Sequence, residues 1–169
     1  PPVGDPPTAR GEPPVPQEEP SDPMPTREPD PGRGGQRSGP GESLLALEQE
    51  VVTLTNAERT AAGCAPLEWD DRLHQAAREH STDMATHNYF SHTGRDGRSP
   101  FDRMRDAGYP NPAAENIAMG YQTRAQVVEG WMNSDGHRRN ILNCQYRTIG
   151  VGLAYDERGR PYWTQVFGR

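Results

Sequence analysis

Five histidines supply the side chains in this sequence that are best suited to bind a metal or to move a proton near neutral pH. Four lie within 19 residues of one another and the fifth stands apart: His74, His80, His87, His92 and His137. His92 and His137 lie in loop-like segments beside small residues, where a rigid scaffold tends to present functional groups. The other three lie on one predicted helix. His80 falls on the apolar stripe of that helix, which is typical of a core histidine, whereas His74 and His87 are interpreted as surface residues.

The spacing of these residues does not by itself make a known kind of catalytic or metal site. The sequence contains no HExxH, no CxxC and no run of clustered carboxylates. It also lacks a GxSxG nucleophile elbow and a phosphate-binding glycine loop. Ser91 adjoins His92, but neighbouring side chains on an extended segment face opposite ways, which disfavours a nucleophile–base pair. The residues alone leave a pairing of His92 with His137 as a hypothesis.

Two regions of very different composition make up the 169 residues. Residues 1–40 hold 13 of the 18 prolines and no aromatic residue, and their large apolar side chains are Val3, Val15 and Met24. Such a segment buries too little surface to offset the entropy of ordering, so residues 1–41 are predicted to be a disordered, extended linker. Prolines in a PxxP-type arrangement permit a second interpretation, a ligand for a proline-binding partner.

The aromatic residues mark the folded part of the chain. All three Trp, all six Tyr and all three Phe follow Glu42, so residues 42–169 are predicted to form one domain. The formal net charge of −6 divides about equally between linker and domain. With no dominant charge, the domain is not expected to bind nucleic acid or an acidic membrane surface. It is expected to be a monomer.

Helical periodicity and capping residues predict four helices in this domain. They cover residues 44–62, 70–87, 99–108 and 123–132. The chain then turns at Asp135-Gly136. After Cys144 the apolar period changes to two, which predicts a hairpin of strands over residues 149–155 and 162–167, with a further short strand through residues 116–118. Helices and a small antiparallel sheet in this order indicate an α+β layered fold rather than a βαβ repeat.

Export of the chain is suggested by how it begins. No apolar run approaches the roughly 20 residues that a membrane span needs. The sequence starts at Pro1 rather than Met, so we expect that an upstream signal or anchor has been removed. A proline-rich spacer ahead of a compact domain suits a secreted or envelope-associated protein.

The two cysteines, Cys64 and Cys144, lie near opposite ends of the domain. In an exported protein such a pair indicates a disulfide, whereas in a cytosolic protein two buried thiols are the expected state. A bridge here would close a loop of about 80 residues. It would contribute roughly 4 kcal/mol to the stability of the fold by restricting the conformations of the unfolded chain.

Six short motifs occur in an order that resembles a known family. They are Phe90–Thr93 (FSHT), Ala114–Ala118 (AENIA), Trp131–Ser134 (WMNS), Gly136–Leu142 (GHRRNIL), Ile149–Gly152 (IGVG) and Tyr162–Gly168 (YWTQVFG). Together they resemble the bacterial branch of the CAP superfamily, which also includes the cysteine-rich secretory proteins, antigen 5 and the pathogenesis-related-1 proteins. The resemblance covers about residues 43–168. It implies an α-β-α sandwich with a central groove, in which many members hold two His and two Glu that can bind a divalent metal.

Three of the four groove positions carry over to this chain, namely His92, Glu115 and His137. The fourth, a Glu three residues after the Trp in the eukaryotic branch, is Ser134 here. Asp135 and Glu129 are the candidate substitutes, and on a helix Glu129 points about 200° away from Trp131. The implied ligand groove is therefore His92, Glu115, Ser134 and His137. The family also pairs a segment like that around Cys64 with a Cys after the Asn-Ile-Leu turn, which supports a disulfide between Cys64 and Cys144.

Two functions follow from this incomplete groove. One is a non-catalytic protein that binds a small apolar ligand, a lipid, a peptide or a cell-envelope component. The other is an extracellular hydrolase assisted by Zn²⁺ or another divalent metal, with His92 and His137 as ligands and Glu115 as a ligand or the catalytic base. Glu115 accepting hydrogen bonds from both imidazoles, without metal or turnover, is the structural alternative. Whether the protein is an enzyme stays open at this point.

Overall fold

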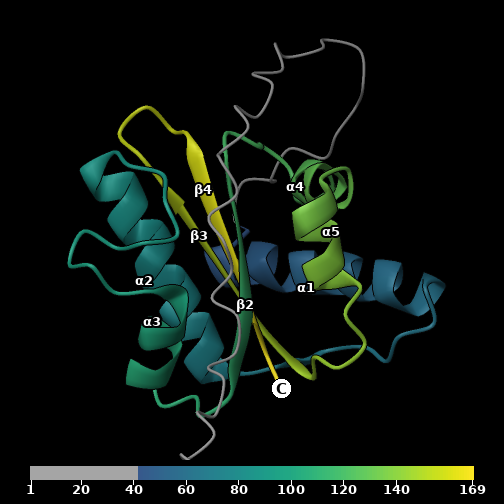
Figure 1. Cartoon of the computed structure of the whole chain (residues 1–169). Coiled ribbons are helices and arrows are strands. Elements are labelled where there is room, and N and C mark those ends of the chain that lie inside the picture. The colour runs from purple at the N-terminus through teal and green to yellow at the C-terminus, as the bar shows by residue number, and fades with distance from the viewer. Residues whose placement is uncertain (1–41) are drawn as a thin grey trace, which may run out of the picture. The chain divides into compact units, whose positions relative to one another are not determined.

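Five helices and four strands follow one another in the computed structural model, which describes residues 42–169 (Figure 1). In chain order they are α1 (Leu44–Ala61), β1 (Glu68–Trp69), α2 (Asp71–His87), α3 (Pro100–Asp106), β2 (Pro112–Met119), α4 (Arg124–Met132), α5 (Asp135–Ile141), β3 (Thr148–Tyr155) and β4 (Pro161–Gly168). The interpretation of residues 1–41 as a disordered linker lies outside the described residues.

Side-chain caps fix where the predicted helices begin. Asp70 accepts hydrogen bonds from the first-turn amides of α2, and Thr123 accepts one from the amide of Gln126 at the start of α4. Ser99 and Asp102 form a reciprocal capping box at α3. These bonds satisfy amide groups that have no partner inside a helix. They confirm the starts that the sequence predicts.

The sheet has the strand order β1-β3-β4-β2. β3 and β4 form the predicted antiparallel hairpin, and β2 pairs antiparallel with β4. Two short elements were not predicted. β1 pairs parallel with β3 over two residues, which makes the sheet mixed, and α5 forms where a turn was expected. β1 has two residues and α5 has seven, which is too few for either to show a clear hydrophobic period in the sequence.

Helices cover both faces of the sheet, as Figure 1 shows, with α2 and α3 on one face and α1, α4 and α5 on the other. This is the predicted α-β-α sandwich. The backbone of α2 lies directly against β3, because Gly150 and Gly152 have no side chain. A Cβ atom at Gly152 would lie 2.3 Å from the carbonyl carbon of Ala77. Within residues 42–169, no helix is long and apolar enough to cross a membrane.

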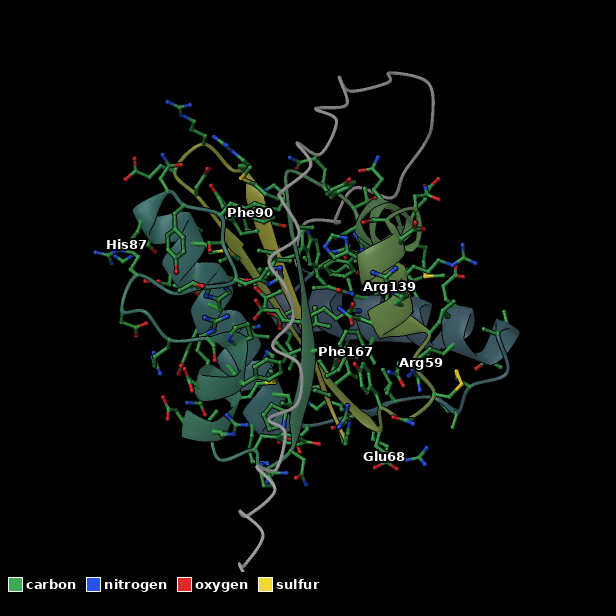
Figure 2. All side chains as sticks on the ribbon, viewed as in Figure 1. Arg59, Glu68, His87, Phe90, Arg139 and Phe167 are labelled. Atoms are coloured by element: carbon green, nitrogen blue, oxygen red, sulfur yellow. A yellow bond between two sulfur atoms is a disulfide. The ribbon has the colours of Figure 1, made fainter. Side chains whose placement is uncertain are left out.

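A buried carboxylate joins the two helical layers at the edge of β3. Glu48 of α1 has no exposed surface, and its Oε1 accepts a hydrogen bond from the amide of Leu153 at 2.9 Å. On α2, His74 Nε2 lies 2.8 Å from Oε2 and Arg78 Nε donates to Oε1 at 2.9 Å. The interpretation of His74 as a surface residue is therefore wrong. His87 does lie at the surface, at the end of α2 (Figure 2).

The disulfide between Cys64 and Cys144 is formed, as predicted. It joins the end of α1 to the segment that follows α5. Hydrogen bonds link the same two segments beside the disulfide. The fully buried Arg59, labelled in Figure 2, donates to the carbonyl oxygens of Ile141 and Asn143, both at 2.8 Å. The C-terminal end of α5 is thus held to α1 by a covalent bond and by a charged hydrogen-bond cluster.

Candidate functional site

Glu115 lies on β2, which forms one edge of the sheet, and its side chain is 2 % exposed. Side chains alternate between the two faces of a strand. Glu115 and Ile117 face the layer of α2 and α3, whereas Asn116 between them bonds to Gln165 and to the main chain of α5. The strand therefore places one carboxylate inside the protein, where it needs charged partners.

Each oxygen of the Glu115 carboxylate has a partner from another element. His92 Nδ1, in the loop between α2 and α3, lies 2.9 Å from Oε1. Arg103 of α3, which is itself buried, donates to Oε2 at 2.9 Å. His80 of α2 places its Nε2 4.0 Å from Oε1. One carboxylate thus organises three side chains from separate parts of the chain.

The charge state of Glu115 determines which ring nitrogen of His92 carries the hydrogen. Burial raises the pKa of the Glu115 carboxyl, but the hydrogen bond from His92, the charge of Arg103 and smaller electrostatic contributions from nearby side chains together lower this pKa, and the net shift is downward. An ionised carboxylate can only accept a hydrogen bond, so Nδ1 of His92 carries the hydrogen. In the neutral ring, Nε2 then keeps its lone pair. The side chain of His92 is 43 % exposed, which leaves an oriented imidazole that solvent and ligands can reach.

His80 supports the loop that carries His92. Its Nε2 donates to the carbonyl oxygen of Ser91 at 2.8 Å. Burial lowers the pKa of His80, and the charge of Arg103 lowers it further, although Glu115 and the Ser91 carbonyl oppose the shift. The prediction of a buried core histidine is confirmed. The sequence did not reveal that this core histidine lies against Glu115.

Acidification is expected to destabilise the protein in part through His80. The folded protein keeps this ring neutral below its ordinary pKa of 6.5, whereas the unfolded chain then binds a proton. The free energy of unfolding should therefore fall as the pH drops below 6.5, by at most about 1.4 kcal/mol per pH unit for this group. Urea unfolding at about pH 7.5 and at about pH 5 measures this loss of stability. The loss should be smaller in His80→Gln, which keeps an N–H donor for the Ser91 carbonyl, than in the wild type. Equal losses in both proteins would contradict this.

His137 reaches the site through its main chain. Asn116 Nδ2 donates to the carbonyl oxygen of His137 at 3.2 Å, and Asn140 Nδ2 donates to Asn116 Oδ1 at 2.9 Å. These bonds hold α5 beside β2, one residue along from Glu115. The Nδ1 atom of His137 is buried. Whether the imidazole of His137 acts together with His92 and Glu115 stays a prediction.

The other predicted positions lie at the ends of α4 and α5. Ser134 is the residue before the first turn of α5, and it makes no side-chain cap there. Its amide donates to the carbonyl oxygen of Trp131 at 3.2 Å. Glu129 and Asp135, the candidate substitutes for the missing glutamate, are both exposed. Neither is a buried counterpart of Glu115.

The available donor atoms do not fit a preformed zinc site. Structural and catalytic zinc sites use at least three protein ligands. Both oxygens of Glu115 already bind His92 and Arg103, and His92 has one ring nitrogen left. Across residues 42–169, no group of three or more His, Cys, Asp or Glu side chains is arranged to hold a metal ion. Metal binding by His92, Glu115 and His137 stays an untested prediction.

Comparison with known proteins agrees with the fold and the motifs. A sequence model of the cysteine-rich secretory protein family, CAP, matches residues 52–167. This chain belongs to the CAP family. The match runs from the middle of α1 to the last residue but one of β4, and it includes Glu115, His92 and His137.

Three bacterial proteins are similar to this chain in sequence or structure. The chain is 49% identical over 126 residues to the protein YkwD of Bacillus subtilis (strain 168), covering 74% of this chain and 48% of that protein. It is 41% identical over 121 residues to the membrane protein YlbC of the same strain, covering 71% and 34%. A solved structure of an extracellular protein containing a SCP domain, from Bacillus anthracis str. Ames, is 34% identical with a TM-score of 0.68, covering 78% and 45%. The chain spans about half or less of the length of each relative.

Proposed function

We propose that this CAP domain is an extracellular or envelope-associated binding module that recognises a peptide or a cell-wall fragment through His92, without catalysing a reaction. Two observations support the location. The similar Bacillus anthracis protein is described as extracellular. The disulfide between Cys64 and Cys144 is of a kind that persists in oxidising compartments outside the cytosol.

The observation that carries the binding function is the imidazole of His92 held by the buried Glu115 carboxylate at 2.9 Å. A ring fixed in this way loses little entropy when it makes a further hydrogen bond, so it is already organised for recognition. Its Nε2 atom accepts a hydrogen bond from an N–H or O–H group. Peptides and glycans carry many such groups, and lipids and other apolar ligands carry few, so the site favours a polar ligand.

Hydrolysis is the competing proposal, and an imidazole oriented by a carboxylate is also what a general base requires. A hydrolase needs in addition a nucleophile or a metal-bound water. The adjacent hydroxyl oxygen of Ser91 accepts a hydrogen bond from the amide of Thr93 at 3.1 Å, which holds it within its own loop. The donor set around Glu115 does not supply three metal ligands. Hydrolysis therefore requires groups that the described residues around His92 do not supply, whereas binding does not.

The variant His92→Asn is expected to weaken binding of soluble peptidoglycan fragments about tenfold, the effect of one lost hydrogen bond. Asparagine places an N–H near the position of Nδ1 and so keeps the bond to Glu115, but it has no atom at Nε2. His92→Gln, whose longer side chain reaches the Nε2 position, should retain more binding. Calorimetric titration of the full chain measures both affinities, and thermal unfolding checks that each variant is folded.

Three outcomes of this titration would contradict the proposal. One is equal affinity of wild type and His92→Asn, and a second is no saturable binding of any fragment. The third is saturable binding of phosphatidylglycerol vesicles in place of the fragments, which would indicate a lipid ligand. Prior dialysis against EDTA should leave the affinity unchanged, because the proposed contact uses no metal. A loss of binding after EDTA would restore the metal-dependent alternative.

A further inference from the structure

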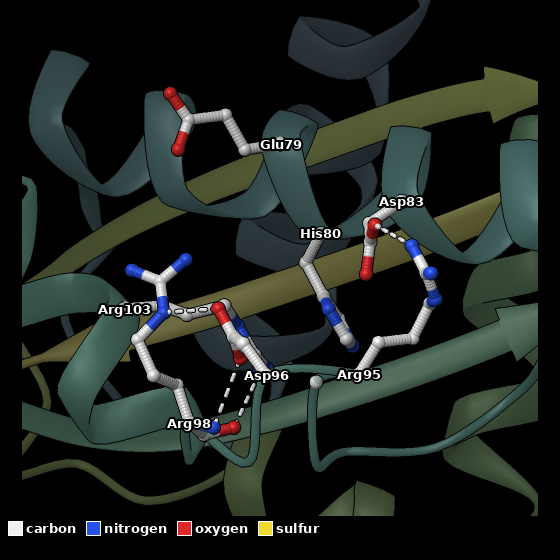
Figure 3. Close-up of a pocket in the computed structure, with 8 residues that line it drawn as sticks. Glu79, His80, Asp83, Arg95, Asp96, Arg98 and Arg103 are labelled. Atoms are coloured by element: carbon white, nitrogen blue, oxygen red, sulfur yellow. Dashed lines mark hydrogen bonds and ion pairs between the residues drawn. The ribbon is translucent and has the colours of Figure 1, made fainter.

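Arg103 is a buried arginine on α3, beside the loop over residues 94–98. It is 7 % exposed, and it lines a pocket of about 430 Å³ between α2 and that loop (Figure 3). The loop is held by ion pairs of its own, because the side chain of Arg98 donates to Asp96 at 2.7 Å and to Asp106 at 2.8 Å. Arg103 therefore lies against a segment that is already fixed.

The guanidinium of Arg103 joins this loop to Glu115. One terminal nitrogen donates to the carbonyl oxygen of Arg98 at 3.2 Å, and the same oxygen accepts a hydrogen bond from the amide of Gly94 at 2.9 Å. The other terminal nitrogen donates to Glu115 Oε2 at 2.9 Å. Because a guanidinium is planar, fixing one of its nitrogens also fixes the direction of the other. Arg103 thereby holds the carboxylate by Oε2 and leaves Oε1 for His92.

Arg103 also supplies Glu115 with a permanent positive charge. A guanidinium stays protonated in proteins. By contrast, burial lowers the pKa of His80, the histidine whose Nε2 lies 4.0 Å from Oε1. A carboxylate in the interior is costly unless it is paired with a cation. Arg103 therefore stabilises the ionised carboxylate that accepts the hydrogen bond from His92.

The hydrogen of His92 lies on the nitrogen that a free imidazole disfavours. Neutral histidine in water prefers to carry its hydrogen on Nε2, whereas the bond to Glu115 at 2.9 Å places it on Nδ1. This reversal depends on a carboxylate that is both ionised and correctly directed. Without such an acceptor, His92 would return to the Nε2–H form, and Nε2 would donate a hydrogen bond instead of accepting one.

We infer that Arg103 is a positioning residue: through Glu115 it selects the Nδ1–H form of His92 and so sets the site to accept a hydrogen bond from its ligand. The inference deepens the proposed function, and its consequence for ligands rests on that function. The choice between ligands that donate and ligands that accept is then made by α3, outside the loop that carries His92.

The ring ¹⁵N shifts of histidine distinguish the two neutral forms, so ¹H–¹⁵N spectra of the labelled full chain at about pH 7.5 test this inference without any ligand. The signals that disappear in His92→Asn identify His92. We expect the wild type to show the Nδ1–H form and Arg103→Lys, which keeps the charge, to retain it. Arg103→Gln, which keeps N–H donors but has no charge, should shift most of the population to Nε2–H.

Two control variants separate positioning from a general loss of stability. Arg105→Gln removes an exposed arginine from the same helix. Val51→Ala removes buried methyl groups from α1, on the other face of the sheet, and should lower the free energy of unfolding. Urea unfolding measures the stability of each variant. Both controls should keep the Nδ1–H form of His92.

An Nε2–H form in the wild type would overturn the inference, even if no Arg103 variant folds. Retention of the Nδ1–H form by folded Arg103→Gln, or an equal loss of this form in either control, would overturn it as well. These outcomes do not depend on whether wall fragments bind, because no ligand is present. Where the fragments bind, Arg103→Gln should weaken binding about tenfold, like His92→Asn. Failure of the proposed function would remove that binding and leave the Nδ1–H form in place.

Discussion

Replacing Glu115 by alanine is expected to lower the free energy of unfolding by about 3–5 kcal/mol, the usual cost of removing one partner of a buried ion pair. The substitution leaves Arg103, which is 7 % exposed, without its carboxylate. It also removes the acceptor that holds His92 Nδ1. Binding at His92 should be lost together with the stability, because both depend on the same carboxylate.

Urea unfolding measures the loss, and Glu129→Ala is the matched control. Glu129 is exposed on α4, where a substitution usually changes stability by less than about 0.5 kcal/mol. If Glu115→Ala does not fold, the single variants Glu115→Gln and Arg103→Gln and the double variant together measure the coupling between the two side chains instead. A cost for Glu115→Ala as small as that for Glu129→Ala would show that the cluster is not held together by this carboxylate.

Replacing Gly152 by alanine is expected to destabilise the protein by about 3 kcal/mol or more, the upper end of the overpacking range. The new Cβ would lie 2.3 Å from the carbonyl carbon of Ala77 and 2.3 Å from the amide nitrogen of Arg78. Both are backbone atoms of α2, so no side-chain rotation relieves the contact and the helix itself must move. His80 lies one turn further along α2, so the bond to the Ser91 carbonyl should weaken as well.

Gly130→Ala is the control for this substitution. A Cβ at Gly130 would also meet an atom at 2.8 Å, but that atom belongs to the ring of Tyr121, a side chain that can rotate. We therefore expect a clearly smaller loss of stability in Gly130→Ala than in Gly152→Ala. Chemical denaturation of both variants makes the comparison. A loss in Gly152→Ala no larger than in the control would mean that α2 can lift from β3 without strain.

The sequence by itself determined the local structure of this domain. Asp70, Ser99 and Thr123 mark helix starts because a side-chain oxygen next to a first turn satisfies amides that nothing else reaches. The change of period after Cys144 identified the hairpin, because alternation along a strand depends only on neighbouring residues. The ordered motifs indicated the family, the sandwich and the disulfide between Cys64 and Cys144.

The tertiary structure alone decided which side chains meet. Nothing near Arg103 or His80 in the sequence indicates that both lie against Glu115, because these contacts join α3, α2 and β2 across the fold. The same holds for Glu48 and His74, which are 26 residues apart. Local sequence patterns indicate which face of a helix or strand a residue occupies. They do not indicate which residues pack against that face. His92 was identifiable from the sequence as a candidate. Its orientation by a buried carboxylate followed only from the packing of distant segments.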